Sequence, residues 1–364
     1  MVTQPTALAD AAPSVDAPAV SAARKLPAEL PTAFAWLRRT PYFQAGLQGY
    51  SDQAMRLVAR RHGAPYCVTE ALLTTHLVAG GRAVTKLRPS PEDHPLAGQL
   101  IGAEPADLAR SARLLIELGY DVIDLNLACP VKRTRTLPRG GQLLADPDHA
   151  ITLLETLSEA VKDAVPLTVK LRRGTDDSPA AEERFQRIFA RVVELGYFAA
   201  TVHGRTVSQK YVGDSDWRTM SDLVQRYPGF VLFGSGDIFS AEAIYDRIRT
   251  SGVRAVSVAR GAIANPWIFR QAAALLSGEP PRAPNLSQQR ETLEAHCEEA
   301  VACDGDVRGT RQMRKFGIYY SRWHPQAETV AKAFVAVKSL NDWRAVLSQW
   351  YDAETAMRLE ARAP

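Results

Sequence analysis

A cysteine at the end of a predicted buried strand is the residue of this chain best placed for chemistry. The segment DVIDLNLACPVKRTRTLPRGG, residues 121–141, predicts a strand that ends near Asn126 and continues into Cys129 and Pro130. The loop after the cysteine carries four cations and no acidic residue: Lys132, Arg133, Arg135 and Arg139. A thiol at a strand tip can reach a substrate, and four neighbouring cations indicate that this substrate is a polyanion.

Further polar side chains follow other apolar runs of the sequence, at the points where those runs end. They are Gln99, Lys170, Arg172, His203, Arg205, Ser235, Gly236 and Arg260. The Gly-Ser-Gly turn at 234–236 lets backbone N–H groups approach an anion, and Arg260 would add a charge-assisted contact. We also expect a helix that begins near Asn265 to direct its N-terminus at that anion.

The apolar runs themselves predict a barrel. Eight candidate strands lie near residues 43–45, 66–69, 98–101, 122–127, 167–171, 199–202, 231–234 and 255–259. Between the later strands, helical patterns cover residues 106–118, 150–164, 181–195 and 241–249. Eight strand–helix units over about 230 residues are typical of an α/β TIM (β/α)8 barrel, whose active sites lie at the C-terminal ends of the strands. A doubly wound sheet is the alternative, but no G-x-G-x-x-G fingerprint follows the first strand.

Composition divides the chain into three parts. Residues 1–37 form an Ala/Pro-rich tail that we expect to be disordered, and residues 38–283 would form the barrel. The Gly/Pro-rich segment 277–284 predicts a linker into a small helical domain over residues 284–364. Helical patterns in that domain cover residues 287–303, 308–320, 328–339 and 341–351.

Overall composition is that of an intracellular globular protein. The 364 residues are 46% hydrophobic, include four cysteines and carry a net charge of +4. Few cysteines and no C-x-x-C pair indicate free thiols in a reducing compartment and argue against a zinc site. No stretch has the length of a signal peptide or membrane span. We therefore expect a cytoplasmic protein without a metal, and the mildly basic charge permits a nucleic-acid partner.

Several motifs together resemble the tRNA-dihydrouridine synthase family. They are DLNLACPVK at 124–132, PLTVKLRRG at 166–174, TVHGRT at 201–206 with Gln209, Tyr211, Gly213, Asp216 and Trp217 after it, GDIFS at 236–240 and ARGAIANPWIF at 259–269. The resemblance extends from about residue 43 to residue 350 and includes MRKFGIYYSRW in the helical tail. It implies an FMN-binding TIM barrel followed by a helical RNA-binding domain. It also implies reduction of a uridine in tRNA to 5,6-dihydrouridine, with NADPH as the reductant of the flavin.

The resemblance also implies roles for individual residues. Cys129 matches the general acid that protonates C5 once hydride has reached C6, because an ordinary thiol is protonated at neutral pH. The positions implied to contact the cofactor are Gly46, Leu47, Gln48, Gln99, Lys170, His203, Ser235, Gly236, Asp237, Ala259 and Arg260. Among them, Arg260 matches the phosphate ligand, and a cationic Lys170 would stabilise the reduced, anionic flavin. Asn126, Arg172 and Arg205 match positions near the substrate.

The chain departs from the family pattern at three turns. Ala45, Gly46 and Leu47 stand where the family has Ala-Pro-Met, Ser235 stands in place of an Asn, and Ala259 stands in place of a Gly. Because turns of this kind contact flavin largely through backbone atoms, we expect FMN still to bind.

The helical tail carries a second group of cations, whose spacing places them on one face of a helix. They are Arg308, Arg311, Arg314 and Lys315. From Gly305 onward the chain holds ten Lys and Arg against six Asp and Glu. Together with Lys132, Arg133 and Arg135 these residues would form one basic track for tRNA phosphates. The pocket of a monomeric enzyme would then select a flipped-out uridine.

Two other interpretations remain open from the sequence. A dihydroorotate dehydrogenase-like enzyme would also use an FMN barrel, but its free pyrimidine substrate needs neither the loop cations nor the basic helices. A non-catalytic RNA-binding barrel would have no need of Cys129, Lys170, His203 and Arg260. Bound FMN would exclude the second interpretation, and binding of tRNA would exclude the first.

Overall fold

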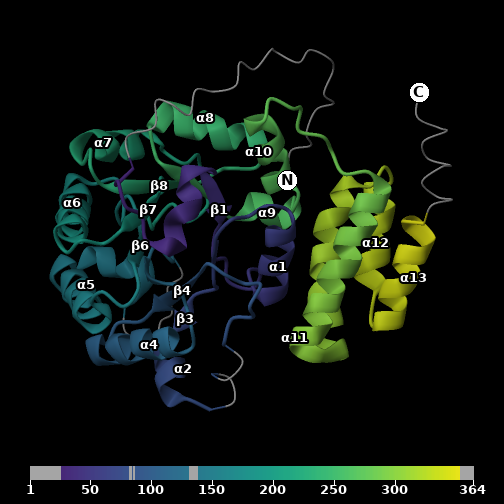
Figure 1. The fold of residues 1–364 in the computed structure, drawn as a ribbon, viewed down its shortest axis with the longest axis horizontal. Helices are drawn as coiled ribbons and strands as arrows, with labels where there is room; N and C mark the ends of the chain where they lie inside the picture. Colours follow the sequence, from purple (N-terminus) through teal and green to yellow (C-terminus); the bar gives the residue numbers. More distant parts are fainter. Residues whose placement is uncertain (1–25, 82–83, 85–86, 131–137, 353–364) are drawn as a thin grey trace.

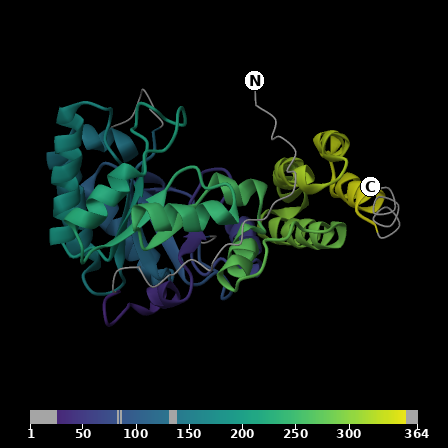
Figure 2. The same cartoon turned by 90° about the horizontal axis from the view of Figure 1, so that it is seen from above.

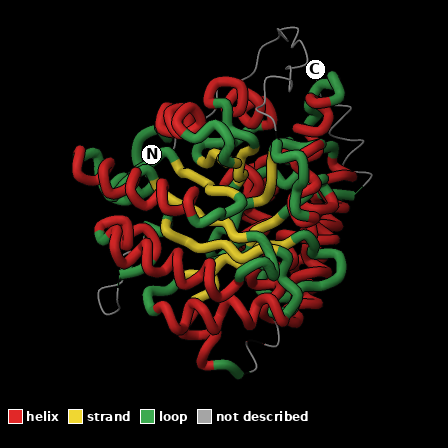
Figure 3. Tube along the Cα trace, turned by 60° about the vertical axis from the view of Figure 1, so that its left-hand side comes forward, coloured by secondary structure: helices red, strands yellow, loops and turns green. Residues whose placement is uncertain are grey.

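A closed barrel of parallel strands forms the centre of the molecule, and helices surround it (Figure 3). The computed structural model describes residues 26–81, 84, 87–130 and 138–352. The strands of the ring are β1 (Tyr42–Gln44), β2 (Cys67–Val68), β4 (Leu96–Ile101), β5 (Val122–Leu127), β6 (Leu167–Arg172), β7 (Ala199–His203), β8 (Val231–Ser235) and β9 (Ala255–Val258). They pair in the order β2–β1–β9–β8–β7–β6–β5–β4, and a β2–β4 pairing closes the ring. The predicted TIM barrel is thus confirmed.

One strand was not predicted from the sequence. β3 (Leu72–Leu73) pairs only with the end of β4, where Leu72 is opposite Leu100. It leads directly into the short helix α2 (Thr74–Ala79). A two-residue strand has too few side chains to show a period, so hydrophobic patterning could not identify it.

The outer helices cover the barrel on its outside. They are α1 (Gln53–Arg61), α4 (Pro105–Glu117), α5 (Pro147–Val161), α6 (Pro179–Glu194), α7 (Arg218–Arg226), α8 (Ala241–Ser251) and α10 (Ile268–Leu276) (Figure 1). Asp52, Asp146, Ser178 and Ser240 each accept a hydrogen bond from a first-turn N–H group, the usual role of an N-cap. Gly252 ends α8 in the left-handed conformation, a common role of glycine after a helix.

The region after β9 differs from the prediction. The short helix α9 (Arg260–Ala264) begins at Arg260, and Asn265 lies in extended backbone between α9 and α10. The predicted helix start near Asn265 is therefore wrong. The residue before a proline is sterically disfavoured in the α region, and Pro266 follows Asn265.

The end of the predicted disordered tail is instead a buried 3-10 helix. Residues 1–25 lie outside the described part of the chain, but η2 (Thr32–Arg38, purple in Figure 1) covers the N-terminal end of the barrel. Phe34 is fully buried and stacks on Phe198 with ring centroids 4.0 Å apart, and Trp36 stacks on Tyr66. The Ala/Pro content of the tail as a whole concealed this aromatic cluster at its end.

The C-terminal helices form a separate layer beside α1 (Figures 1 and 2). They are α11 (Leu286–Tyr320), α12 (Ala327–Ala336) and α13 (Leu340–Trp350). α11 breaks at Gly305, where φ is 77°, so the two helices predicted on either side of this residue are distinct. Gly309 then packs so closely on Ala300 that an added Cβ would lie 2.7 Å from its carbonyl oxygen. The second half of α11 therefore folds back on the first.

We expect Phe34→Ala to lower the free energy of unfolding by about 3–5 kcal/mol, because it removes a fully buried ring. Urea unfolding of the full chain measures the loss. Thr32→Ala changes an exposed residue of the same 3-10 helix and serves as the matched control. Equal stability of the Phe34 variant and the control would mean that this segment does not pack on the barrel.

Candidate active site

A cavity of about 680 Å³ opens at the C-terminal ends of the barrel strands. Its lining includes every residue that the sequence predicted for the cofactor, together with Asn126, Cys129 and Arg172. Leucines and an isoleucine from β3, α2 and β4 make part of the wall apolar. The fold thus gathers residues from seven strand ends, separated by more than 200 positions in the sequence, into one chamber.

A chain of hydrogen bonds leads from a buried carboxylate to the backbone of the cysteine. Gln99 Nε2 donates to Asp124 Oδ2 at 2.8 Å, and Asn126 Nδ2 donates to Gln99 Oε1 at 2.7 Å. Asn126 Oδ1 then accepts from the backbone N–H groups of Ala128 and Cys129 at 3.0 and 2.9 Å. Because a carboxylate only accepts, Asp124 fixes which way each amide points. The chain of bonds therefore sets the position of Cys129.

The carbonyl group of Cys129 is held as well. The N–H group of Gly141 donates to it at 3.0 Å, and Gly140 takes a positive φ of 60° beside the cysteine. A Cβ on Gly140 would lie 3.0 Å from the Cys129 Cβ, so glycine permits this close return of the chain. The predicted loop cations Lys132, Arg133 and Arg135 lie outside the described residues, while Arg139 lines the cavity.

Lys170 lines the cavity, and its surroundings act on its pKa in opposite directions. Its Nζ lies 3.4 Å from the hydroxyl of Ser235, which it can donate to. Burial lowers the pKa of Lys170 to about 8, and the charge of Asp124 acts in the opposite direction. Burial also raises the pKa of Asp124, whereas hydrogen bonds from Thr168 and Gln99 and the charge of Lys170 lower it. The amine is thus largely cationic at neutral pH and loses its proton near pH 8.

His203 is a neutral donor at the same wall. Its pKa is lowered to about 2, first by burial and then by the charges of neighbouring cations. Nδ1 accepts from the backbone N–H of Arg205 at 3.1 Å, so the neutral ring carries its proton on Nε2. A hydrogen-bond donor without charge therefore lines the cavity at this position.

Two arginines that the sequence assigned to ligands share one carboxylate. Asp237 Oδ2 pairs with Arg205 Nη2 at 2.7 Å, and Oδ1 pairs with Arg260 Nη2 at 3.0 Å. Arg205 is only 4% exposed, and it also donates to the carbonyl group of Gly213. It does not appear in the cavity lining, so we assign it to holding the loop rather than the substrate. Arg260, at 39% exposed, lies at the cavity wall.

Arg172 lines the cavity but is mostly committed to backbone carbonyl groups. Its Nε donates to Ala128 at 2.8 Å, and its Nη1 donates to Thr206 and Lys210 at 2.7 and 2.8 Å. These bonds tie the cysteine segment to the loop after β7. Its Nη2 has no recorded partner among the described residues, and this N–H group is the one available to a ligand.

Comparison of the whole sequence with known protein families agrees with the residues found in this cavity. A sequence model of the family described as dihydrouridine synthase (Dus) matches residues 43–355. This chain belongs to the dihydrouridine synthase family. The match covers the barrel and the C-terminal helices together, so it includes all strands of the ring except the first residue of β1.

Similar proteins come from several bacteria. "tRNA-dihydrouridine synthase B" of Xanthomonas axonopodis pv. citri is 30% identical over 85% of this chain and 92% of its own length. The protein of the same name from Pseudomonas aeruginosa is 31% identical over 84% and 91%. "Probable tRNA-dihydrouridine synthase" of Rhodobacter capsulatus is 32% identical over 77% and 86%. Histamine dehydrogenase from Rhizobium sp. 4-9 shares the fold, with a TM-score of 0.51 at 11% identity over 71% of this chain and 48% of that one.

The cations that the sequence predicted on one helical face separate in this dihydrouridine synthase. Arg308, Arg311 and Arg314 are exposed on the second half of α11. Lys315 instead turns toward the barrel, where it donates to the carbonyl group of Gly49 and lies 4.3 Å from the ring centroid of Tyr50. Lys315 therefore contacts the barrel, unlike the three arginines, and its predicted role in RNA binding stays a prediction.

Asp124, Tyr211 and Phe239 belong to the site but were not among the predicted site residues. Asp124 could have been suspected, because it is an acidic residue inside an apolar strand. Tyr211 and Phe239 line the cavity and are 52% and 54% exposed, unusually high values for large aromatic side chains. Sequence offered no signal for their exposure, since it depends on how the rim loops pack.

The described residues contain no group of three or more His, Cys, Asp or Glu side chains arranged to hold a metal ion. No helix in the same part of the chain has the length and apolar character needed to cross a membrane.

We expect Asp237→Asn to lower the free energy of unfolding by about 3 kcal/mol, because it leaves the buried Arg205 guanidinium without its counter-charge. Asparagine keeps an acceptor oxygen and tolerates the φ of 53° at this position. Asp246→Ala breaks an exposed pair with Arg249 and should change stability by less than about 1 kcal/mol. Similar urea midpoints for both variants would contradict the role given to Asp237.

Proposed function

We propose that this chain reduces a uridine of tRNA to 5,6-dihydrouridine, with FMN as the bound flavin and NADPH as its reductant. The observation that carries the proposal is the single cavity of the dihydrouridine synthase barrel in which Cys129, Asn126, Lys170, His203 and Arg260 meet. Family membership favours this activity over a dihydroorotate dehydrogenase-like reaction or a non-catalytic barrel.

The residues present fit a phosphorylated flavin. A cavity of about 680 Å³ with an apolar wall has room for a ring system and part of a substrate. Arg260 offers a guanidinium for a phosphate, and Lys170 offers a positive charge for a reduced, anionic ring. The Nε2–H group of neutral His203 suits a carbonyl oxygen, since it donates without adding charge. Ser235 and Ala259, which depart from the family pattern, leave this donor set intact.

The side chains divide the work of the reaction. Bound FMN, when reduced, would supply the hydride that adds to C6 of the uracil ring. The Cys129 thiol donates its proton to C5, which completes addition across the C5=C6 bond. Asn126 holds the cysteine backbone for this transfer, and the remaining N–H group of Arg172 is positioned to bind the base. Cys129 is half-buried, so its thiolate can recover a proton from solvent.

We expect Cys129→Ala to slow dihydrouridine formation by about 10²–10⁴-fold, the usual contribution of a general acid. Oxidation of NADPH by the bound flavin should continue, because that step requires no proton from the thiol. Single-turnover formation of dihydrouridine and flavin bleaching under NADPH separate the two steps.

Cys303→Ala is the matched control, because Cys303 is the other half-buried free thiol among the described residues. This control should retain wild-type rates in both steps. A Cys129 variant that forms dihydrouridine as fast as the control would remove Cys129 from the role of acid.

RNA binding rests, in this proposal, on the exposed cations of α11 with those of the loop after Cys129. Arg308, Arg311 and Arg314 are exposed beside the barrel. They would neutralise RNA phosphates and release the counterions condensed on them, with little sequence preference. The loop residues Lys132, Arg133 and Arg135 would extend this track to the thiol. Arg139, which lines the cavity, would stand at its inner end.

We expect Arg311→Glu with Arg314→Glu to weaken tRNA binding and to reduce the slope of log affinity against log salt by about one per lost contact. FMN content should not change. Arg110→Glu with Arg113→Glu places two exposed changes at the same i, i+3 spacing on α4 and controls for net charge. Equal tRNA affinities for the two double variants would locate the RNA elsewhere.

A further inference from the structure

The guanidinium of Arg260 lies between two aromatic rings at the mouth of the cavity. Its Cζ lies 5.2 Å from the ring centroid of Tyr211 and 5.2 Å from that of Phe239. Among the large hydrophobic side chains that are exposed in the described part of the chain, these two are the only aromatic ones. Exposure of two large apolar rings to water is unfavourable. Their contact with the same cation therefore calls for an explanation.

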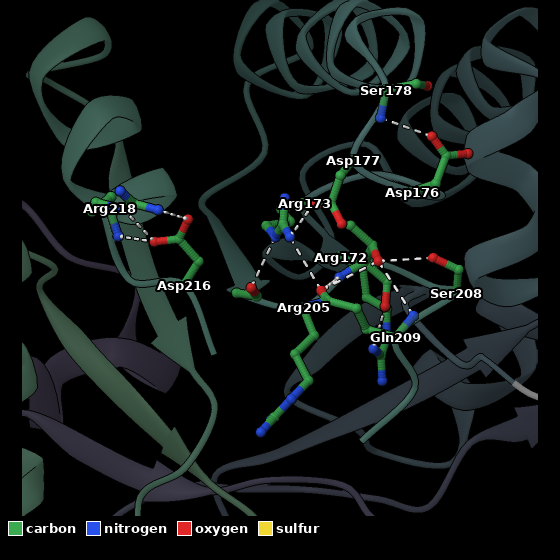
Figure 4. A network of polar contacts seen from close by, with 12 residues as sticks. Arg172, Arg173, Asp176, Asp177, Ser178, Arg205, Ser208, Gln209, Asp216 and Arg218 are labelled. Atoms are coloured by element: carbon green, nitrogen blue, oxygen red, sulfur yellow. Dashed lines mark hydrogen bonds and ion pairs between the residues drawn. The ribbon is translucent and has the colours of Figure 1, made fainter. Parts of the chain in front are cut away.

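The backbone on both sides of Tyr211 is fixed. Arg172 donates to the carbonyl group of Lys210 at 2.8 Å, and Arg205 donates to that of Val212 at 3.3 Å. Arg173 adds bonds to the carbonyl group of Gly204 and to Gln209 Oε1 in the same loop (Figure 4). The backbone that carries the tyrosine ring is therefore held in place by the protein itself.

The backbone of Phe239 is fixed against the residue that follows Arg260. A Cβ on Gly261 would lie 2.1 Å from the carbonyl oxygen of Ile238 and 3.2 Å from the Cα of Phe239. Ile238 is buried, and Ser240 caps α8 directly afterwards. Phe239 thus presents its ring from a rigid turn, although the ring itself is 54% exposed.

The guanidinium retains donors and charge in this position. Only its Nη2 is recorded in a hydrogen bond within the described structure, to Asp237 at 3.0 Å. Asp237 also neutralises Arg205, so one carboxylate faces two arginines and one positive charge is left over. The negative faces of the two rings attract the guanidinium and so favour its present position.

We propose that Tyr211 and Phe239 form an aromatic clamp that holds the Arg260 guanidinium for the phosphate of the flavin. Phe239 is then a positioning residue that makes the site prefer FMN over riboflavin. The inference rests on the proposed function, because it takes Arg260 as the phosphate ligand. It goes beyond that function in two ways. It gives a role to Phe239, which donates no hydrogen bond to the cofactor, and it explains how the site would select the phosphorylated flavin.

Titration of flavins into the flavin-stripped full chain tests the clamp, with quenching of flavin fluorescence as the readout. Phe239→Ala should raise the Kd for FMN by about 2- to 5-fold, the range that loss of an exposed cation–π contact implies. The Kd for riboflavin, which has no phosphate, should stay at its wild-type value. Phe239→Trp should restore the preference for FMN, because it restores an aromatic face, whereas Phe239→Leu should not.

Val212→Ala is the matched control, since Val212 is 77% exposed on the same loop as Tyr211 and is not recorded in contact with Arg260. It should leave both Kd values unchanged. Equal weakening of FMN and riboflavin in Phe239→Ala, or full restoration by Phe239→Leu, would overturn the clamp. A wild-type chain that binds FMN no more tightly than riboflavin would contradict the assignment of Arg260 to the phosphate, and so both the clamp and the cofactor proposal on which it rests.

Discussion

The buried carboxylate of Asp124 sets the direction of the hydrogen bonds on which the site depends. It accepts from Thr168 on one oxygen and from Gln99 on the other, at 2.6 and 2.8 Å. An amide group has one donor end and one acceptor end, so fixing the first amide fixes the next. The Gln99 amide in this way fixes the Asn126 amide, whose oxygen accepts from the backbone N–H group of Cys129. The backbone of Cys129 is thus positioned through Asp124, which is not among the residues that line the cavity.

Arginines do two different kinds of work at the rim of this barrel. Arg172 and Arg205 direct most of their N–H groups at backbone carbonyl groups of the loop after β7, and Arg173 contributes there too. Rim loops have few strand partners for these carbonyl groups, and a guanidinium offers five donors in a planar arrangement that a lysine lacks. Arg139 and Arg260, by contrast, are half-buried and line the cavity. A basic rim is therefore partly structural even in an enzyme with a polyanionic substrate.

The helical layer is joined to the wall of the cavity through few residues. Lys315 contacts Gly49 and the ring of Tyr50, and the Tyr50 hydroxyl lies 3.3 Å from that of Tyr319 on α11. The N–H group of Tyr50 donates to Glu70, which follows β2. The turn that begins this segment lines the cavity. Displacement of α11 would therefore act on the cofactor side of the pocket, because the same short segment contacts both.

The sequence by itself determined the barrel, the strand ends and the residues that meet there. Alternating apolar runs and helical patterns are local features of the sequence. All strands of a parallel barrel direct their C-terminal ends to one face, so the sequence alone could predict that Cys129, Lys170 and His203 meet there. Only the tertiary structure decided which cations are free. Arg205 is buried against Asp237, 32 positions away, and Lys315 is committed to Gly49, 266 positions away. It likewise decided that Phe34 covers the barrel and that Phe239 remains exposed, because burial depends on packing between segments that no local period records.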